Sequence, residues 1–186
     1  MSTPHDGSRP LDGDAIKGLL EEVSRRLTPG PTRHVVVIVG GSLLALHGLR
    51  NTTMDVDSVE RFDHELETAV AEVAEERALE PDWLNARAAR FRPATLVLDD
   101  CEVLLETETL VVRGAPLREV LAMKLLRGNQ NDLADIVKIL PVAGFTSATE
   151  AVESFYEAYP HEPEDPELPS LIRQLARNGG LDLPLK

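Results

Sequence analysis

The order of apolar and polar positions along this chain of 186 residues predicts alternating helices and strands. Residues 14–27 carry apolar side chains at helical spacing, and Pro29-Gly30-Pro31 ends the predicted helix. The next segment, Val35–Val39, consists of five β-branched apolar residues and predicts a fully buried strand. Gly40-Gly41 then predicts a sharp turn, and Ser42 is a candidate N-cap for a short helix that follows.

The chain is expected to return through a second strand at residues 55–59, whose first three residues alternate acidic and apolar side chains. Asp63 is the expected N-cap of a long helix that ends near Leu79. Three further strands are expected at residues 95–98, 102–106 and 109–112. Asp99-Asp100 is the expected turn of a hairpin between two of them.

The last third of the chain predicts helices separated by short breaks. They are expected from Pro116 to Gly128, from Asn131 or Asp132 to Leu140, from Thr146 or Ser147 through Tyr156, and from Leu171 to Arg177. The intervening residues 160–169 are rich in proline and acids, which predicts a loop or linker. The predicted class is therefore α/β (α+β): a small mixed sheet flanked by helices, with a C-terminal helical part.

The length fits one domain, or one domain with a small helical appendage. We expect a flexible N-terminus over residues 1–13, a core over 14–115, a helical part over 116–159 and a tail with a short helix over 160–186. The polar residues 1–13 contain no apolar signal-peptide core, and no apolar run reaches the roughly 20 residues that span a bilayer. Cys101 is the single cysteine, which excludes an internal disulfide and fits a reducing, cytoplasmic compartment.

The formal net charge of −13 argues against broad electrostatic capture of nucleic acid, because such binding depends on Lys and Arg neutralising phosphates. Contacts with an RNA substrate are therefore expected to be few and concentrated near Arg50, Lys124 and Arg127.

Chemistry is expected where the two predicted strands meet the turn. Alternation places the carboxylates of Asp55 and Asp57 on one face of their strand, where like charges repel unless a cation lies between them. Mg²⁺ is the usual cation, held by a couple of carboxylates together with substrate phosphates. The backbone amides of Gly40, Gly41 and Ser42 would bind those phosphates. Each motif alone is also typical of an ordinary turn or a solvated strand end.

Together the motifs Gly40-Gly41-Ser42, His47-Gly48-x-Arg50-x-Thr52 and Asp55-Val56-Asp57 resemble the nucleotidyltransferase superfamily of DNA polymerase β type. Within it they are most similar to the AbiEii-like and MenT-like nucleotidyltransferases of bacterial toxin–antitoxin systems. The resemblance implies a Mg²⁺-dependent enzyme that uses an NTP, with Asp55 and Asp57 as catalytic metal ligands and Arg50 near the phosphates.

A second likeness lies in the C-terminal part, in Leu121-Ala-Met-Lys124 and Asn131-Asp132-Leu-Ala-Asp135. Relatives show an Ala-x-Lys helix and then Arg-Asp-x-x-Asp, so Asn131 replaces the arginine here. The resemblance implies that Lys124 and Asp132 are catalytic, and that Lys124 and Asp135 contact the nucleotide. The alternative is that Asp132 is only an N-cap and Lys124 a surface residue with its ammonium in water.

The expected function is transfer of a nucleoside monophosphate from an NTP to an acceptor hydroxyl. The resemblance implies the tRNA 3′ end as acceptor, a growth-arresting toxin and a cognate antitoxin as protein partner. Two alternatives stay open: a nucleotidyltransferase that modifies protein, and a nucleotide- or antitoxin-binding module with a degenerate site. Polymerase-β-like enzymes also carry a third carboxylate on a later strand, for which Glu102 and Glu106 are the candidates by position, although neither has a diagnostic neighbourhood.

Overall fold

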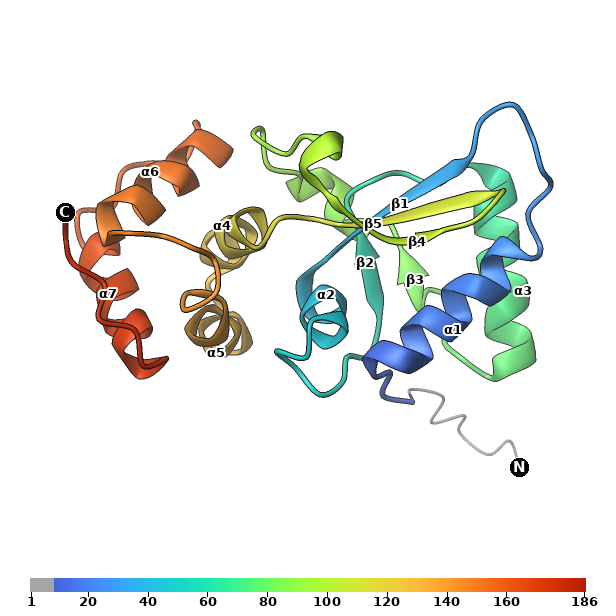
Figure 1. The fold of residues 1–186 in the computed structure, drawn as a ribbon, viewed down its shortest axis with the longest axis horizontal. Helices are drawn as coiled ribbons and strands as arrows, with labels where there is room; N and C mark the ends of the chain where they lie inside the picture. The colour runs from blue at the N-terminus through green and yellow to red at the C-terminus, as the bar shows by residue number, and fades with distance from the viewer. Residues whose placement is uncertain (1–8) are drawn as a thin grey trace. The chain divides into compact units, whose positions relative to one another are not determined.

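The computed structural model describes residues 9–186, and within them the predicted mixed α/β class is confirmed. Seven α-helices and a five-stranded sheet of order β3-β2-β1-β5-β4 make up these residues (Figure 1). The chain divides into two compact units. The first contains the residues up to Arg90 together with Glu102–Gly114, and the second contains Phe91–Cys101 and Ala115–Lys186.

The sheet belongs to the first unit. Its strands are β1 (His34–Val39), β2 (Val56–Ser58), β3 (Leu84–Asn85), β4 (Glu102–Glu106) and β5 (Leu110–Gly114). β1 is the middle strand, antiparallel to β2 and parallel to β5. Its residues from Val36 to Val39 are fully buried, because a central strand whose two faces are both covered needs an uninterrupted apolar run. β3 is parallel to β2, and β4 is antiparallel to β5.

The helices of the first unit are α1 (Gly13–Ser24), α2 (Gly40–Leu46) and α3 (His64–Arg77). Asp63 caps α3 as predicted, since its Oδ1 accepts a hydrogen bond of 2.9 Å from the amide of Leu66. Ion pairs join α1 and the residues just after it to α3, with Glu22 of α1 contacting Arg77, and Arg26 contacting Glu72 and Glu76. Trp83 is buried beside α3, where its indole N–H donates to the carbonyl of Val70 at 3.2 Å. The contact of Trp83 with α3 fixes the segment that leads into β3.

The second unit is built from helices. They are α4 (Leu117–Arg127), α5 (Gln130–Ile139), α6 (Ala148–Ala158) and α7 (Leu168–Asn178). α4 ends as predicted at Gly128, whose φ of 60° lies in the left-handed region that glycine adopts without a steric penalty. The end of the chain returns to α6, where the amides of Ala148 and Thr149 donate to the carbonyls of Pro184 and Leu185.

The strand predicted at residues 95–98 is wrong, and so is the hairpin turn predicted at Asp99-Asp100. This segment closes on itself through bonds between residues three apart, and Leu98–Asp100 form a 3₁₀ helix. The observed hairpin joins β4 to β5 later in the chain. Its turn is organised by Thr107, whose hydroxyl accepts from the amides of Thr109 and Leu110.

The segment before α1 is tied to the core. Leu11 is buried and exchanges two backbone hydrogen bonds, of 2.7 and 2.8 Å, with Thr53. Asp12 then caps α1 by accepting from the amide of Ala15 at 2.8 Å. The rest of the predicted flexible N-terminus, residues 1–8, lies outside the described residues.

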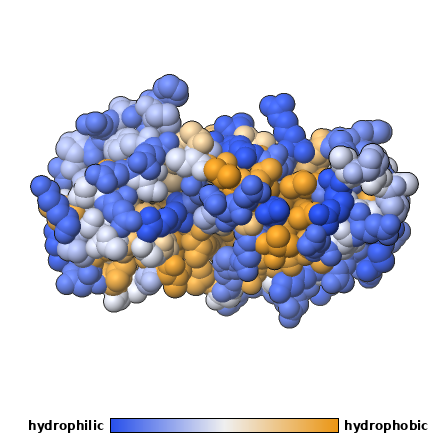
Figure 2. Space-filling view, turned by 45° about the horizontal axis from the view of Figure 1, so that its top comes forward, coloured by the Kyte–Doolittle hydropathy of each residue, from blue (hydrophilic) through white to orange (hydrophobic). Residues whose placement is uncertain are grey.

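Large apolar side chains are exposed at several separate positions. Figure 2 shows orange, hydrophobic residues interspersed with blue, hydrophilic ones on the face that it draws. The exposed large apolar residues of the described chain are Met54, Phe91, Val97, Val103, Val142, Leu171 and Leu185. Among residues 9–186, no helix combines the length and the apolar composition that a membrane crossing requires.

A hydrogen-bonded carboxylate at the start of α6, Glu150, leads to a prediction about the pH dependence of stability. Glu150, at the start of α6, accepts hydrogen bonds of 2.7 Å from the amide and the hydroxyl of Thr146 and from the guanidinium of Arg118. These bonds, those from Thr146 first, lower the pKa of Glu150 from 4.5 to about 2. Because the folded pKa lies below the unfolded one, this stabilisation is present above pH 4.5 and is lost as the pH falls towards 2.

We therefore expect Glu150→Gln to lower the urea midpoint of unfolding at pH 7, since an amide cannot replace all the charge-assisted bonds. The difference from the unmodified protein should shrink between pH 5 and pH 2, where Glu150 itself becomes neutral. Glu153→Gln, an exposed change on the next turn of α6, is the matched control and should leave the midpoint nearly unchanged at every pH. A Glu150→Gln effect of equal size at pH 7 and pH 2 would contradict this assignment.

Candidate functional site

The paired aspartates lie at one end of β2, beside the turn that follows β1. Asp55 directly precedes β2 and Asp57 is its middle residue, while Val56 and Ser58 are fully buried. Successive side chains of an extended segment alternate, so the two carboxylates project away from the face that buries Val56. Asp57 pairs with Val39, the last residue of β1. A Cβ placed on Gly40 would lie 3.8 Å from Oδ2 of Asp57, so this carboxylate reaches the turn.

The glycine turn also contacts a guanidinium. Gly40 has a φ of +65°, a conformation that residues with a side chain rarely adopt. A Cβ on Gly41 would lie 2.8 Å from Nη1 of Arg50 and 3.0 Å from Oγ1 of Thr53, so these side chains occupy the space that glycine leaves open. Nε of Arg50 donates to the carbonyl of Thr52 at 2.9 Å, which orients the guanidinium. Arg50 therefore lies beside the turn, and its binding of phosphate stays a prediction.

Ser42 differs from its prediction as an N-cap. α2 begins at Gly40 and its N-cap is Val39, so Ser42 lies inside the first turn of the helix. Its side chain is buried, and its hydroxyl donates to the carbonyl of Val39 at 2.9 Å. The hydroxyl is thus used within the fold, and Ser42 has only its backbone to offer a phosphate. The reason is that glycine at two consecutive positions lets the helix start directly at the end of β1.

Arg87 contacts the candidate site through Asp55, a contact that the motifs did not indicate. Its Nη2 lies 3.3 Å from Oδ2 of Asp55, and its Nη1 lies 3.2 Å from Oδ2 of Asp82. Oδ1 of Asn85 accepts from Nε of Arg87 at 3.1 Å and from its backbone N–H at 2.9 Å. Asn85 ends β3, directly opposite Asp57 in β2. Only its position in the chain could have indicated Arg87. It follows β3, which pairs with the strand that carries the aspartates, so it lies near them at the edge of the sheet.

The candidates for a third carboxylate lie on a distant strand. β4 is separated from β2 by β5 and β1, which places their backbones roughly 14 Å apart at the usual spacing between strands. Oε2 of Glu102 lies 3.1 Å from Nε2 of His47, and Glu106 pairs with Arg33. Among residues 9–186, no group of three or more His, Cys, Asp or Glu side chains is arranged to hold a metal ion.

Two carboxylates nevertheless fit the metal that the motifs predict. Mg²⁺ prefers hard oxygen ligands and is commonly bound through one or two carboxylates, with waters and substrate phosphates completing its six positions. Asp55 keeps 41% of its side chain exposed, so an ion can reach it from solvent. Asp55 and Asp57 are therefore the residues of this unit that would hold Mg²⁺.

The second predicted cluster lies wholly in the second unit, between α4 and α5. Nζ of Lys124 is 2.9 Å from Oδ1 of Asp132 and 2.7 Å from Oδ2 of Asp135. Arg127 also binds Asp132 through its Nε at 2.6 Å and its Nη2 at 2.5 Å. Only 4% of the Lys124 side chain and none of Asp132 is exposed. The cluster holds two cations and two carboxylates and is close to neutral.

The alternative interpretation of this cluster, with Asp132 only as an N-cap and Lys124 at the surface, is wrong in both parts. The N-cap of α5 is Asn129, whose side chain accepts from the amide of Asp132 at 2.9 Å, so Asp132 is free to bind the two cations. Lys124 is a buried residue and does not extend its ammonium to water. Burial raises the pKa of Asp132, but hydrogen bonds from Arg127 and Lys124 outweigh this effect and hold it below its usual value. Arg127 therefore gives Asp132 a guanidinium partner although Asn131 occupies the arginine position of the relatives.

The predicted site residues thus form two groups, one in each unit. The first unit brings together Asp57, Gly40, Gly41 and Arg50 at one turn, with Asp55 beside Arg87. The second unit brings together Lys124, Asp132 and Asp135, with Arg127 added.

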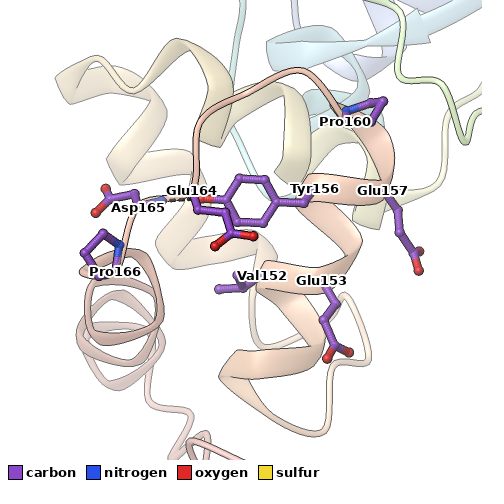
Figure 3. Close-up of a pocket in the computed structure, with 8 residues that line it drawn as sticks. All are labelled: Val152, Glu153, Tyr156, Glu157, Pro160, Glu164, Asp165 and Pro166. Carbon is purple, nitrogen blue, oxygen red and sulfur yellow. Dashed lines mark hydrogen bonds between the residues drawn. The ribbon is translucent and has the colours of Figure 1, made fainter.

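A shallow hollow on the second unit contains none of these residues (Figure 3). It lies beside α6, around the ring of Tyr156, whose hydroxyl accepts from the amide of Asp165 at 2.6 Å. Four carboxylates line it and no basic residue does; its lining residues are Val152, Glu153, Tyr156, Glu157, Pro160, Glu164, Asp165 and Pro166. This charge repels a triphosphate, so the hollow is a poor candidate for an NTP site.

Comparison with known proteins adds no family assignment. No protein-family model, no curated protein and no solved structure matches the chain. The resemblance to nucleotidyltransferases therefore stays a prediction, which depends on the motifs of the sequence and on the site geometry given above.

Proposed function

We propose that this protein is a Mg²⁺-dependent nucleotidyltransferase that moves a nucleoside monophosphate from an NTP to an acceptor hydroxyl. The observation that carries the proposal is the approach of Asp57 to the Gly40-Gly41 turn, beside Arg50. Carboxylates that bind a divalent cation and a turn that receives phosphates must be neighbours for this chemistry.

In the proposed reaction the acceptor oxygen forms a bond to the α-phosphorus of the NTP. The bond from that phosphorus to the pyrophosphate oxygen breaks, its electron pair leaves with pyrophosphate, and the hydroxyl proton passes to solvent. Mg²⁺, when bound, neutralises charge on the triphosphate and lowers the pKa of the attacking group.

The residues of the chain have separate tasks in this proposal. Asp55 and Asp57 bind and orient the cation, while the backbone of Gly40 and Gly41 donates to the terminal phosphates. The guanidinium of Arg50 adds a fixed positive charge at the same turn. The resemblance extends the proposal to Lys124, whose ammonium would offset charge on the leaving pyrophosphate.

The acceptor and the partner are proposed from the resemblance alone. They are the 3′ end of tRNA, and a cognate antitoxin that restrains a growth-arresting activity. The net charge of −13 argues against a broad basic surface, so an RNA acceptor would be contacted through a few cations.

A degenerate nucleotide-binding module is the second candidate. The observation that favours it is Lys124, whose ammonium already has two carboxylate partners within 2.9 Å and is almost completely buried. To bind a phosphate, this ammonium must give up at least one of these partners. A module of this kind would bind NTPs in the presence of metal without releasing pyrophosphate.

Labelled transfer distinguishes the two candidates. The protein is incubated with Mg²⁺, total bacterial tRNA and each labelled NTP in turn, and released pyrophosphate is measured in parallel. We expect label on tRNA from one or more NTPs, and none with Asp57→Asn or with EDTA. Label on protein would show that the acceptor is a protein hydroxyl and not tRNA. NTP binding with neither label nor pyrophosphate would overturn the enzyme in favour of the binding module.

A further inference from the structure

The guanidinium of Arg87 contacts the carboxylate of Asp55 and also two neighbouring side chains on its own segment. Its Nη2 contacts Asp55 at 3.3 Å, while Nη1 contacts Asp82 at 3.2 Å and Nε contacts Asn85 at 3.1 Å. The backbone amide of Arg87 binds the same Asn85 oxygen at 2.9 Å, which fixes where the side chain begins. The side chains of Arg87 and Asp55 are 56% and 41% exposed, so the pair can open without unfolding its surroundings.

The contact with Asp55 uses an oxygen that a metal ion would need. Oδ2 of Asp55 accepts from Arg87, and a Mg²⁺ ligand oxygen must approach to about 2.0–2.1 Å of the ion. A guanidinium nitrogen that stays 3.3 Å from that oxygen would hold its positive charge next to the ion, where like charges repel. The cation and the guanidinium therefore compete for one carboxylate.

We propose that Arg87 is an internal counterion of Asp55, released when a divalent cation binds and then available to the triphosphate. Without metal it offsets the repulsion between Asp55 and Asp57. After release its Nη1 and Nε remain held by Asp82 and Asn85, close to the cation site, and its Nη2 is left to donate charge-assisted hydrogen bonds to phosphate oxygens. The inference rests on the proposed function, because it assumes that Asp55 and Asp57 bind the metal.

The arrangement predicts effects of opposite sign on two ligands. Removing the guanidinium should tighten binding of the cation alone and weaken binding of the nucleotide to the metal-loaded protein. A residue that only braces the loop between Asp82 and Arg87 would weaken both or affect neither.

Mn²⁺ is the probe for the first effect, since its paramagnetic signal reports binding without turnover. We expect Arg87→Gln to bind Mn²⁺ about fivefold more tightly than the unmodified protein in the absence of nucleotide, as fits loss of a partly exposed pair. Arg87→Lys keeps the charge without the fork and should stay within about twofold of the unmodified protein. Arg25→Gln removes the same charge from the exposed end of α1 and should leave the affinity unchanged.

The second effect is measured at saturating Mn²⁺ with a non-hydrolysable NTP analogue. We expect about tenfold weaker binding by Arg87→Gln and unchanged binding by Arg25→Gln, because the charge-assisted contact from Nη2 of Arg87 to a phosphate oxygen is lost. The Asp57→Asn variant distinguishes a failure of the proposed function from a failure of the counterion role of Arg87. Equal Mn²⁺ binding by Asp57→Asn and the unmodified protein would overturn the proposed function itself. Binding that depends on Asp57 but is the same in Arg87→Gln would overturn only the counterion.

Discussion

Lys124→Met should lower the free energy of unfolding by about 3–5 kcal/mol, among the largest effects of any single change in the described chain. Lys124 is the shared partner of Asp132 and Asp135, which are themselves buried. Methionine fills a similar volume but offers no positive charge, so Asp135 keeps a buried carboxylate without the ammonium that faced it. Urea unfolding followed by circular dichroism measures the loss.

Two further variants make the interpretation specific. Lys138→Met changes the same residue type at an exposed position of α5 and should cost no more than about 0.5 kcal/mol. Lys124→Met combined with Asp135→Asn removes one charge of each sign and should recover at least half of the loss, because the remaining Asp132 still binds Arg127. Additive costs in the double variant would contradict a charge-pairing role for the cluster.

The same variants separate structural and catalytic roles of the cluster. A loss of activity in Lys124→Met alone says little, because the second unit would be destabilised at the same time. Recovered stability without recovered nucleotidyl transfer in the double variant would assign the Lys124–Asp135 pair to the reaction. Recovery of both would make the cluster a structural ion-pair network and leave the chemistry with the first unit.

The parts of the fold that follow from local sequence were predictable. The run Val35–Val39 has no polar position and became the central strand, and Asp63 caps α3 where the capping pattern placed it. Gly128 ends α4 because its left-handed conformation suits glycine. In each case a few neighbouring residues determine the outcome, so the pattern needs no knowledge of distant contacts.

The parts of the structure that depend on contacts between residues far apart in the sequence could not be predicted. β3 has two residues, and it is a strand only because Leu84 and Asn85 pair with β2. Arg87 was missed for the same reason, since its contact with Asp55 joins residues 32 positions apart. Lys124 was open to two interpretations because its burial depends on α5 packing against α4. A capping role stayed open as the alternative for Asp132 because Asn129 and Asp132 are both good capping residues.

Asp57→Asn should reduce nucleotidyl transfer by about 1,000-fold or more while changing the free energy of unfolding by no more than about 1 kcal/mol. The amide has the shape of the carboxylate but lacks the negative charge that binds a divalent cation. Loss of this charge also relieves the repulsion between residue 57 and Asp55, so the fold should be little affected. Initial rates with the preferred NTP, and urea unfolding of the same samples, measure the two quantities.

Controls for this prediction come from three other carboxylates. Asp55→Asn should lose activity to a similar extent, because both aspartates are proposed to hold one cation. Asp99→Asn makes the same chemical change at an exposed position of the second unit and should retain full activity. Glu102→Gln should also retain most activity, since β4 lies roughly 14 Å from β2 and Glu102 faces His47. A Glu102→Gln variant as inactive as Asp57→Asn would place the third carboxylate on β4 after all, and full activity of Asp57→Asn would remove the metal site from the mechanism.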